Sequence, residues 1–228
     1  MISFWDNSLF NYLPHIAIGL LIFGVITRFV KASKTIQATS TQLLSNDKMF
    51  NWSIMLFHYG IVFVLLGHIF GLFTPRWLYE LVMTPDTKRM LAISMGSFFG
   101  ICAFIGIVTL TIRRFTNERI HDNSSVHDIF ISLLISVQIF LGVWSTAITA
   151  VSPPEQYFML DTWAKGVVTF QPDAASVMAQ MSLIHKLHIL GGLFIFILFP
   201  YSKLMHFLVA PIQYLWRRAE QLVWMRKS

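Results

Sequence analysis

The chain has 228 residues, of which 55% are hydrophobic and only 12% are charged. Soluble domains carry about 25% charged residues, so this composition excludes an ordinary soluble enzyme and indicates a membrane protein. The formal net charge of +6 does not indicate nucleic-acid binding, because the basic residues are divided among separate connections.

Five apolar runs are long enough to cross a bilayer, which takes about 20 helical residues. They cover roughly residues 12–30, 52–73, 90–112, 127–150 and 183–208, and each is read as a transmembrane helix. Little sequence remains for a soluble domain. We therefore expect a single all-α membrane domain over residues 1–228, built as a bundle of five transmembrane helices.

The first run opens with Pro14, which suits the first position of a helix. His15 lies beside it near the end of the span. We do not expect His15 to bind a metal, because no unpaired histidine elsewhere matches its depth.

The second and fifth runs hold two histidines each: His58 and His68, then His188 and His206. Ionisable side chains inside a membrane span are costly and mark functional sites by default. At 1.5 Å per residue the first two are about 15 Å apart along their helix, and the last two about 27 Å. If the two helices are antiparallel, His68 matches His188 in depth and His58 matches His206.

Two imidazoles from facing helices are the axial ligands that a six-coordinate b-type haem needs. We therefore expect two haem b groups, an outer one between His68 and His188 and an inner one between His58 and His206. Pro200 should kink the last span between its ligands. Several glycines would let a flat macrocycle approach the helices: Gly60, Gly67, Gly71, Gly191 and Gly192. The alternative is that the histidines only form hydrogen bonds between helices.

Other metal and catalytic chemistry is excluded by what the sequence lacks. Cys102 is the single cysteine, so there is no internal disulfide, iron–sulfur or zinc cluster, and no site for covalent c-type haem attachment. No phosphate-binding loop or nucleophile–base motif is present, which argues against hydrolysis and phosphoryl transfer.

The connections set the expected orientation. Twelve basic residues flank one side of the five spans and five flank the other. The positive-inside rule then places the N-terminus outside and the C-terminus in the cytoplasm.

Local signals predict how several helices begin and end. Pro85 and Asp86 form a turn into the third span. Ser125 and Asp128 resemble a capping box that opens the fourth, with Asn123 and Ser124 as alternative caps. Pro153 and Pro154 end that span. Residues 157–170 are expected to form a short amphipathic helix at the outer surface, either a plain interfacial helix or a lid over His68 and His188. Trp77 and Tyr79 suit the headgroup belt, and residues 211–228 a cytoplasmic amphipathic helix.

Nearly the whole chain resembles the membrane cytochrome b (gamma) subunit of respiratory nitrate reductases. The resemblance is carried by LFHYGIVFVLLGHIFGLFTPRWLYE (56–80), WAKGVVTF (163–170) and LHILGGLFIFILFPYSKLMH (187–206). It implies five spans, two b haems and oxidation of a membrane quinol, menaquinol or ubiquinol, at the outer haem. Electrons would pass to a cytoplasmic iron–sulfur (beta) subunit and a molybdenum (alpha) subunit that reduces nitrate, at the bacterial cell membrane.

The resemblance also implies a quinol site at Gly67, His68 and Lys88. From sequence alone, Lys88 could equally be an interfacial lysine with its ammonium in water. His185 lies one turn before His188, so the choice of His188 as ligand depends partly on the family. Alternatives are a cytochrome b for a formate dehydrogenase, hydrogenase or heterodisulfide-type reductase, or a haem-free anchor.

Overall fold

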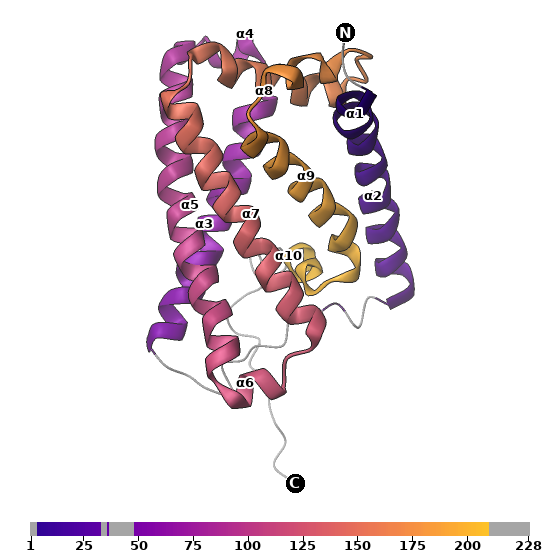
Figure 1. Ribbon diagram of the computed structural model, residues 1–228, viewed down its shortest axis with the longest axis vertical. Helices are drawn as coiled ribbons and strands as arrows, with labels where there is room; N and C mark the ends of the chain where they lie inside the picture. Colours follow the sequence, from indigo (N-terminus) through magenta and orange to yellow (C-terminus); the bar gives the residue numbers. More distant parts are fainter. Residues whose placement is uncertain (1–3, 33–35, 37–47, 210–228) are drawn as a thin grey trace, which may run out of the picture.

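The computed structural model describes residues 4–32, 36 and 48–209, and the regular secondary structure of this part of the chain is all helical (Figure 1). Within it, five helical segments are long and apolar enough to cross a membrane: Phe4–Ala32, Lys48–Phe73, Pro85–Thr116, Val126–Val151 and Leu183–Tyr201. The first segment combines α1 (Phe4–Asn7), a π-helix (Ser8–Tyr12) and α2 (Leu13–Ala32). The next three segments are the single helices α3 (Lys48–Phe73), α5 (Pro85–Thr116) and α7 (Val126–Val151). The fifth is α9 (Leu183–Leu198) with a terminal turn. The prediction of an all-α protein with five spans is confirmed for these residues.

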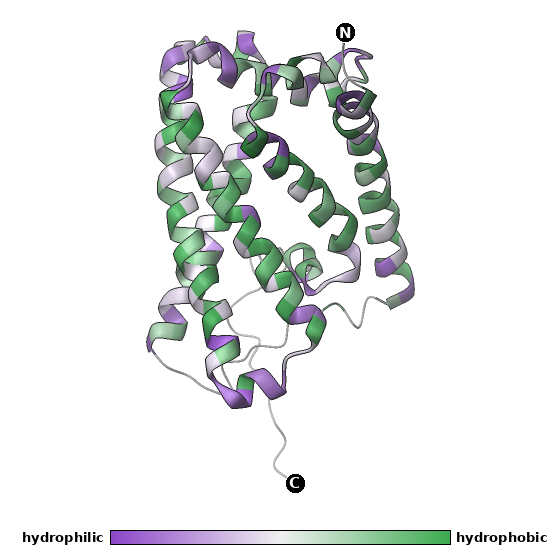
Figure 2. Cartoon of the chain, viewed as in Figure 1, coloured by the Kyte–Doolittle hydropathy of each residue, from purple (hydrophilic) through white to green (hydrophobic). Residues whose placement is uncertain are grey.

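The long helices pack in sequence around the bundle: α3 on α5, α5 on α7, α7 on α9, and α9 on α2. Two short helices, α4 (Arg76–Tyr79) and α8 (Pro154–Val168), lie with α1 at one end, here called the α8 end (Figure 1). The opposite end carries α6 (Glu118–Asp122) and is called the α6 end. Hydrophobic residues cover the helices between the two ends, and hydrophilic residues gather at the ends (Figure 2). The helix expected over residues 157–170 is therefore confirmed as α8.

The first span begins earlier than residue 12, because the helix continues through Pro14. Proline has no N–H for the carbonyl four residues back, and its ring crowds that carbonyl. A π-turn over Ser8–Tyr12 precedes Pro14 and accommodates it. The carbonyl of Phe10 instead accepts a 2.9 Å hydrogen bond from Nε1 of Trp163 in α8. Phe10 is also buried against Met178. The carbonyl that Pro14 leaves without a helical partner therefore helps to hold α8 against the first span.

Two glycines let α3 and α5 approach very closely. A Cβ at Gly60 would lie 2.7 Å from the backbone nitrogen of Ala103, and one at Gly106 would lie 2.5 Å from that of Phe57. Small residues at such positions are the usual means of close packing between membrane helices. The contacts make the two helices antiparallel and set their register, with Lys88 about level with Phe73.

The third span begins earlier than residue 90, because Pro85 and Asp86, expected in a preceding turn, form the first turn of α5. The N-cap is Thr84, whose side chain accepts from the backbone of Thr87. α7 begins with a complete capping box between Ser125 and Asp128, so Ser125 is the cap. Two residues separate α7 from Pro154, the first residue of α8.

The last span is not the single kinked helix expected over residues 183–208. α9 ends at Leu198, and a 3₁₀ turn, Phe199–Tyr201, follows around Pro200. Ser202 is extended (φ −110°, ψ 170°), and a second 3₁₀ turn, Lys203–Met205, leads into α10 (His206–Val209). Pro200 is fully buried against Gly24 of α2. The proline therefore ends the helix, and His206 is carried by a separate short element.

The amphipathic helix expected over residues 211–228 lies outside the described residues.

Candidate functional site

The histidines of the second and fifth spans meet in two pairs, matched as their spacing predicts. At the α8 end, the ring centres of His68 and His188 are 6.1 Å apart. Towards the α6 end, those of His58 and His206 are 6.2 Å apart. α3 is unbroken, so the two pairs differ in depth by about 15 Å. The 27 Å expected for the last span does not apply, because that span is not one helix.

All four imidazoles are oriented by backbone carbonyls at Nδ1. His58 Nδ1 lies 2.9 Å from the oxygen of Ile54, and His68 Nδ1 lies 2.8 Å from that of Val64. His206 Nδ1 lies 2.6 Å from the oxygen of Lys203. A carbonyl oxygen can only accept, so Nδ1 of His58, His68 and His206 carries the proton and Nε2 of each neutral ring keeps its lone pair.

His188 is held more elaborately than the others. Its Nδ1 lies 3.2 Å from the carbonyl oxygen of Gln138 in α7, and the side-chain amide of Gln138 donates a 2.8 Å hydrogen bond to the His188 carbonyl. Gly142, one turn further along α7, leaves room for the ring, because a Cβ there would lie 2.9 Å from His188 Cε1. Sequence reasoning did not single out Gln138, although a polar side chain inside an apolar span is a signal for such a role.

The glycines divide into two groups. A Cβ at Gly67 or Gly71 would meet nothing within 4 Å, so these positions border open space, as expected. Gly60 instead packs against α5, and Gly191 and Gly192 face the side chain of Gln138. The expectation that all five glycines face a bound macrocycle is therefore wrong for these three, whose space is taken by neighbouring helices.

His185 has a different environment from His188. It is 4% exposed, its Nε2 lies 3.0 Å from Thr149 Oγ1, and its Nδ1 lies 2.7 Å from Ser182 Oγ. Hydroxyl groups thus occupy both ring nitrogens, and His185 joins α9 to α7. Of the two histidines one turn apart, only His188 faces His68.

His15 faces no other histidine ring among the described residues. Its Nδ1 and Nε2 lie 2.6 Å and 2.8 Å from the carbonyl oxygens of Asn11 and Val167, and its ring stacks on Phe170. His15 links the first span to the end of α8, which is a structural role.

Lys88 is buried at the start of α5. It is 6% exposed, and its ammonium lies 4.2 Å from the ring centre of Tyr79. Its Nζ is buried without a hydrogen-bond partner. The alternative of an interfacial lysine with its ammonium in water is therefore contradicted. From the register of α3 and α5, Lys88 lies about 7 Å nearer the α8 end than His68.

Tyr79 differs from its neighbour in the connection after α3. Trp77 is 69% exposed, as expected for a headgroup-belt residue, but Tyr79 is 7% exposed beneath Lys88. Burial raises the pKa of Tyr79 above its ordinary value.

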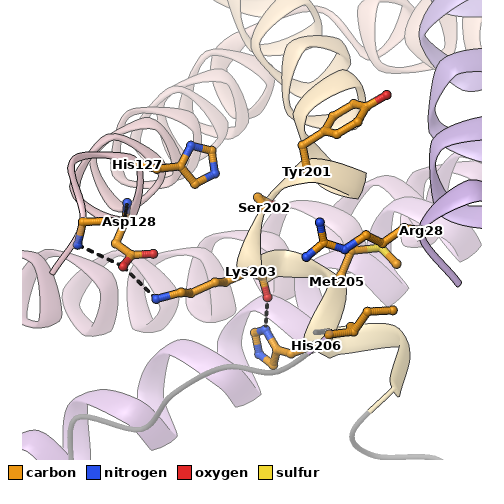
Figure 3. A pocket seen from close by; sticks show the side chains of 10 residues that line it. Arg28, His127, Asp128, Tyr201, Ser202, Lys203, Met205 and His206 are labelled. Atoms are coloured by element: carbon orange, nitrogen blue, oxygen red, sulfur yellow. Dashed lines mark hydrogen bonds and ion pairs between the residues drawn. The ribbon is translucent and has the colours of Figure 1, made fainter. Parts of the chain in front are cut away.

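A cavity of about 340 Å³ lies beside His206 towards the α6 end (Figure 3). Its lining includes the basic side chains of Arg28, His127 and Lys203, together with the carboxylate of Asp128 and the ring of His206. Lys203 Nζ is 2.7 Å from Asp128 Oδ2, whereas Arg28 Nε is buried without a hydrogen-bond partner. The cavity is therefore suited to an anionic group, a feature that sequence reasoning missed because the three residues come from distant parts of the chain.

In the part of the chain that the structure describes, no three His, Cys, Asp or Glu side chains converge to hold a bare metal ion. The site is instead two pairs of facing imidazoles inside five apolar helices. Fold and site together define a multi-pass membrane protein with paired histidines at two depths.

The comparisons with known proteins identify the family. The model of the nitrate reductase gamma subunit family matches residues 6–226. The chain is 32% identical over 219 residues to the respiratory nitrate reductase 2 gamma chain of Escherichia coli, covering 96% of both proteins. It is 33% identical to the respiratory nitrate reductase 1 gamma chain of the same organism, over 95% of this chain and 96% of that one. It is 34% identical to the nitrate reductase gamma chain of Bacillus subtilis, over 92% and 94% of the two chains. The chain belongs to the nitrate reductase gamma subunit family, and the resemblance seen in its sequence is confirmed.

Proposed function

We propose that this chain is the dihaem cytochrome b subunit of a respiratory nitrate reductase and forms a single membrane domain over residues 1–228. The observation that carries the proposal is the pair of facing imidazoles at each of two depths. In this role the chain oxidises a membrane quinol near the α8 end and passes electrons towards the α6 end.

The residues fit haem at both positions. A bond from a metal to an imidazole nitrogen is about 2.0–2.1 Å long, so two imidazoles on opposite sides of one metal have ring centres roughly 6 Å apart. The observed separations are 6.1 and 6.2 Å. Two imidazoles do not hold a bare ion, but haem brings four equatorial nitrogens and needs only axial ligands.

Four residues would hold the two groups through Nε2: His68 and His188 the outer haem, His58 and His206 the inner one. Haem b supplies a reversible one-electron iron couple. The backbone carbonyls at each Nδ1 fix the ring orientation and increase the basicity of the ligand, which is the usual arrangement around metal-bound histidine. Arg28, Lys203 and His127 would hold the acidic groups of the inner haem in the cavity beside His206.

The quinol site is proposed at Lys88, Gly67 and His68. The unpaired ammonium of Lys88 can donate to a quinol oxygen, and the open space beside Gly67 lets a flat ring lie against α3. Either menaquinol or ubiquinol has the chemistry required. His68 would join this site to the outer haem that it holds.

The proposed orientation places the α8 end outside and the α6 end in the cytoplasm of a bacterial cell. It is supported by the distribution of basic residues, since the connections with more Lys and Arg remain on the cytoplasmic side. An iron–sulfur subunit and a molybdenum subunit would dock at the α6 end, where the inner pair lies. Reporters fused to the two termini test this: the N-terminal one should be external and the C-terminal one cytoplasmic, and the reverse result would refute it.

The decisive experiment is a reduced-minus-oxidised absorption spectrum of the purified chain, followed by reduction with a quinol. We expect two b-type components, both reduced by quinol in the membrane complex. Absence of any b-type signal would refute the proposal in favour of a haem-free anchor, and a b-type signal that quinol cannot reduce would refute quinol oxidation alone.

A further inference from the structure

A cluster of buried polar groups lies where α4, α5 and α8 meet. Lys88, Tyr157 and Asp161 are 6%, 8% and 8% exposed. In each residue a side-chain polar atom is buried without a hydrogen-bond partner: Nζ of Lys88, the hydroxyl of Tyr157 and Oδ1 of Asp161. Buried polar groups in native proteins are almost always hydrogen-bonded, so three unpaired groups together call for an occupant.

The three groups are close enough to interact. Asp161 acts electrostatically on Lys88 and on Tyr157, and also on Tyr79, whose ring lies under the Lys88 ammonium. α8, which carries Tyr157 and Asp161, packs against both α3 and α5. The cluster therefore borders the part of the chain that the proposed function assigns to quinol.

The chemistry of the cluster matches a dihydroxy aromatic molecule. Burial raises the pKa of Tyr157 to about 12, so its hydroxyl stays protonated and is available as a donor. Lys88 is a second donor. Asp161 Oδ2 accepts from Lys165 at 2.9 Å, which leaves Oδ1 as the unpaired acceptor. A quinol hydroxyl both donates and accepts, and two donors beside one carboxylate oxygen complement it.

We propose that Asp161 and Tyr157 of α8 complete the quinol site, with Asp161 Oδ1 accepting the proton of a quinol hydroxyl and Tyr157 hydrogen-bonding the quinol oxygen. This inference rests on the proposed quinol oxidation. In the overall reaction both O–H bonds of the quinol break and its two protons leave, and its two electrons would be accepted, one at a time, by the haem that His68 and His188 would hold. Asp161 takes one proton at a time and releases it to the water at the α8 end.

The test compares four variants of the whole membrane complex. Asp161→Asn removes the acceptor, and Tyr157→Phe removes only the hydroxyl. Lys165→Gln breaks the Asp161–Lys165 ion pair but keeps the carboxylate, and Glu155→Gln neutralises an exposed carboxylate at the start of the same helix. For each, quinol-dependent nitrate reduction is measured beside the haem spectrum and beside nitrate reduction with reduced viologen, which bypasses the quinol site.

We expect Asp161→Asn to lower kcat with quinol by about a hundredfold, the usual contribution of a positioned general base. Tyr157→Phe should raise KM for quinol by about tenfold, consistent with the loss of one buried hydrogen bond. Haem content and viologen activity should not change in either variant. Lys165→Gln removes the ion pair but keeps the acceptor, so it should lose less quinol-dependent activity than Asp161→Asn. Glu155→Gln, the control, should remain within about twofold of the parent.

Three results overturn the inference. Unchanged quinol kinetics in Asp161→Asn would show that Asp161 is not the proton acceptor. If Lys165→Gln lost as much activity as Asp161→Asn, Asp161 would be only one half of a structural ion pair. If Asp161→Asn fails to assemble, Tyr157→Phe decides, and an unchanged KM refutes the site. Failure of the proposed function is distinct, because the unsubstituted complex would then show no quinol-dependent haem reduction.

Discussion

Gly142 of α7 leaves the space that the His188 ring occupies, so Gly142→Ala tests the outer histidine pair without altering a ligand. The new Cβ would lie 2.9 Å from His188 Cε1, whereas carbon atoms in contact are normally about 3.5–4.0 Å apart. The ring must therefore move by about 0.6–1.1 Å. Overpacking of this kind costs about 1–3 kcal/mol, and each 1.4 kcal/mol is about tenfold in an equilibrium constant.

We expect Gly142→Ala to weaken retention of the outer haem by about ten- to a hundredfold, or to shift its midpoint potential, while the inner haem is unchanged. The assay is a redox titration of both b-type signals in the purified complex. Gly96→Ala in α5 is the matched control, because its Cβ would lie 3.9 Å from Thr146 in ordinary contact. If the two variants gave the same two potentials and haem content, the assignment of His188 to the outer haem would be refuted.

Three further predictions concern single side chains. His206→Ala should remove the inner haem and spare the outer one, because the ring that His206 faces in the described structure is that of His58. A redox spectrum checks this, and selective loss of the outer haem would reverse the assignment. Lys88→Ala should keep both haems and viologen-driven nitrate reduction but strongly lower quinol-driven activity, since it removes a buried unpaired donor; unchanged quinol turnover would refute its role. His185→Ala should retain both haem signals but lower stability by about 1–3 kcal/mol, because it removes the two side-chain hydrogen bonds to Thr149 and Ser182. A thermal melt of that variant, with haem absorption as a second signal, distinguishes the loss of stability from the loss of haem. If the protein stayed folded but lost the outer haem, His185 would be the ligand.

Local chemistry made several features of this protein predictable from sequence. Helix length and hydropathy identified the five spans, because a bilayer requires every backbone group to be paired within a continuous apolar helix. The capping box at Ser125 depends on residues only a few positions apart. The pairing of His68 with His188 followed from the constant rise of a helix, whereas His206 meets His58 across a break in the last span that this rise does not describe.

Other features depend on contacts between distant segments, which spacing does not specify. Pro200 was expected to kink a helix, but its packing against Gly24 accompanies a complete break before His206. His185 and His188 lie on a similar face of one helix. Two side chains of α7 distinguish them, because the hydroxyl of Thr149 binds the His185 ring and the amide of Gln138 binds the backbone carbonyl of His188.

The α8 end is the clearest case of what tertiary structure decided. In sequence Lys88 was equally consistent with a site residue or an interfacial lysine, because hydropathy does not specify which groups cover a side chain. Folding places Tyr79 against its ammonium and brings Asp161 and Tyr157 beside it from about seventy residues away along the chain. The sequence by itself determined where the membrane helices run and the relative depth of His58 and His68 on α3, since both follow from regular backbone geometry. Only the tertiary structure decided which polar groups are buried together without partners, because that depends on how separate helices pack.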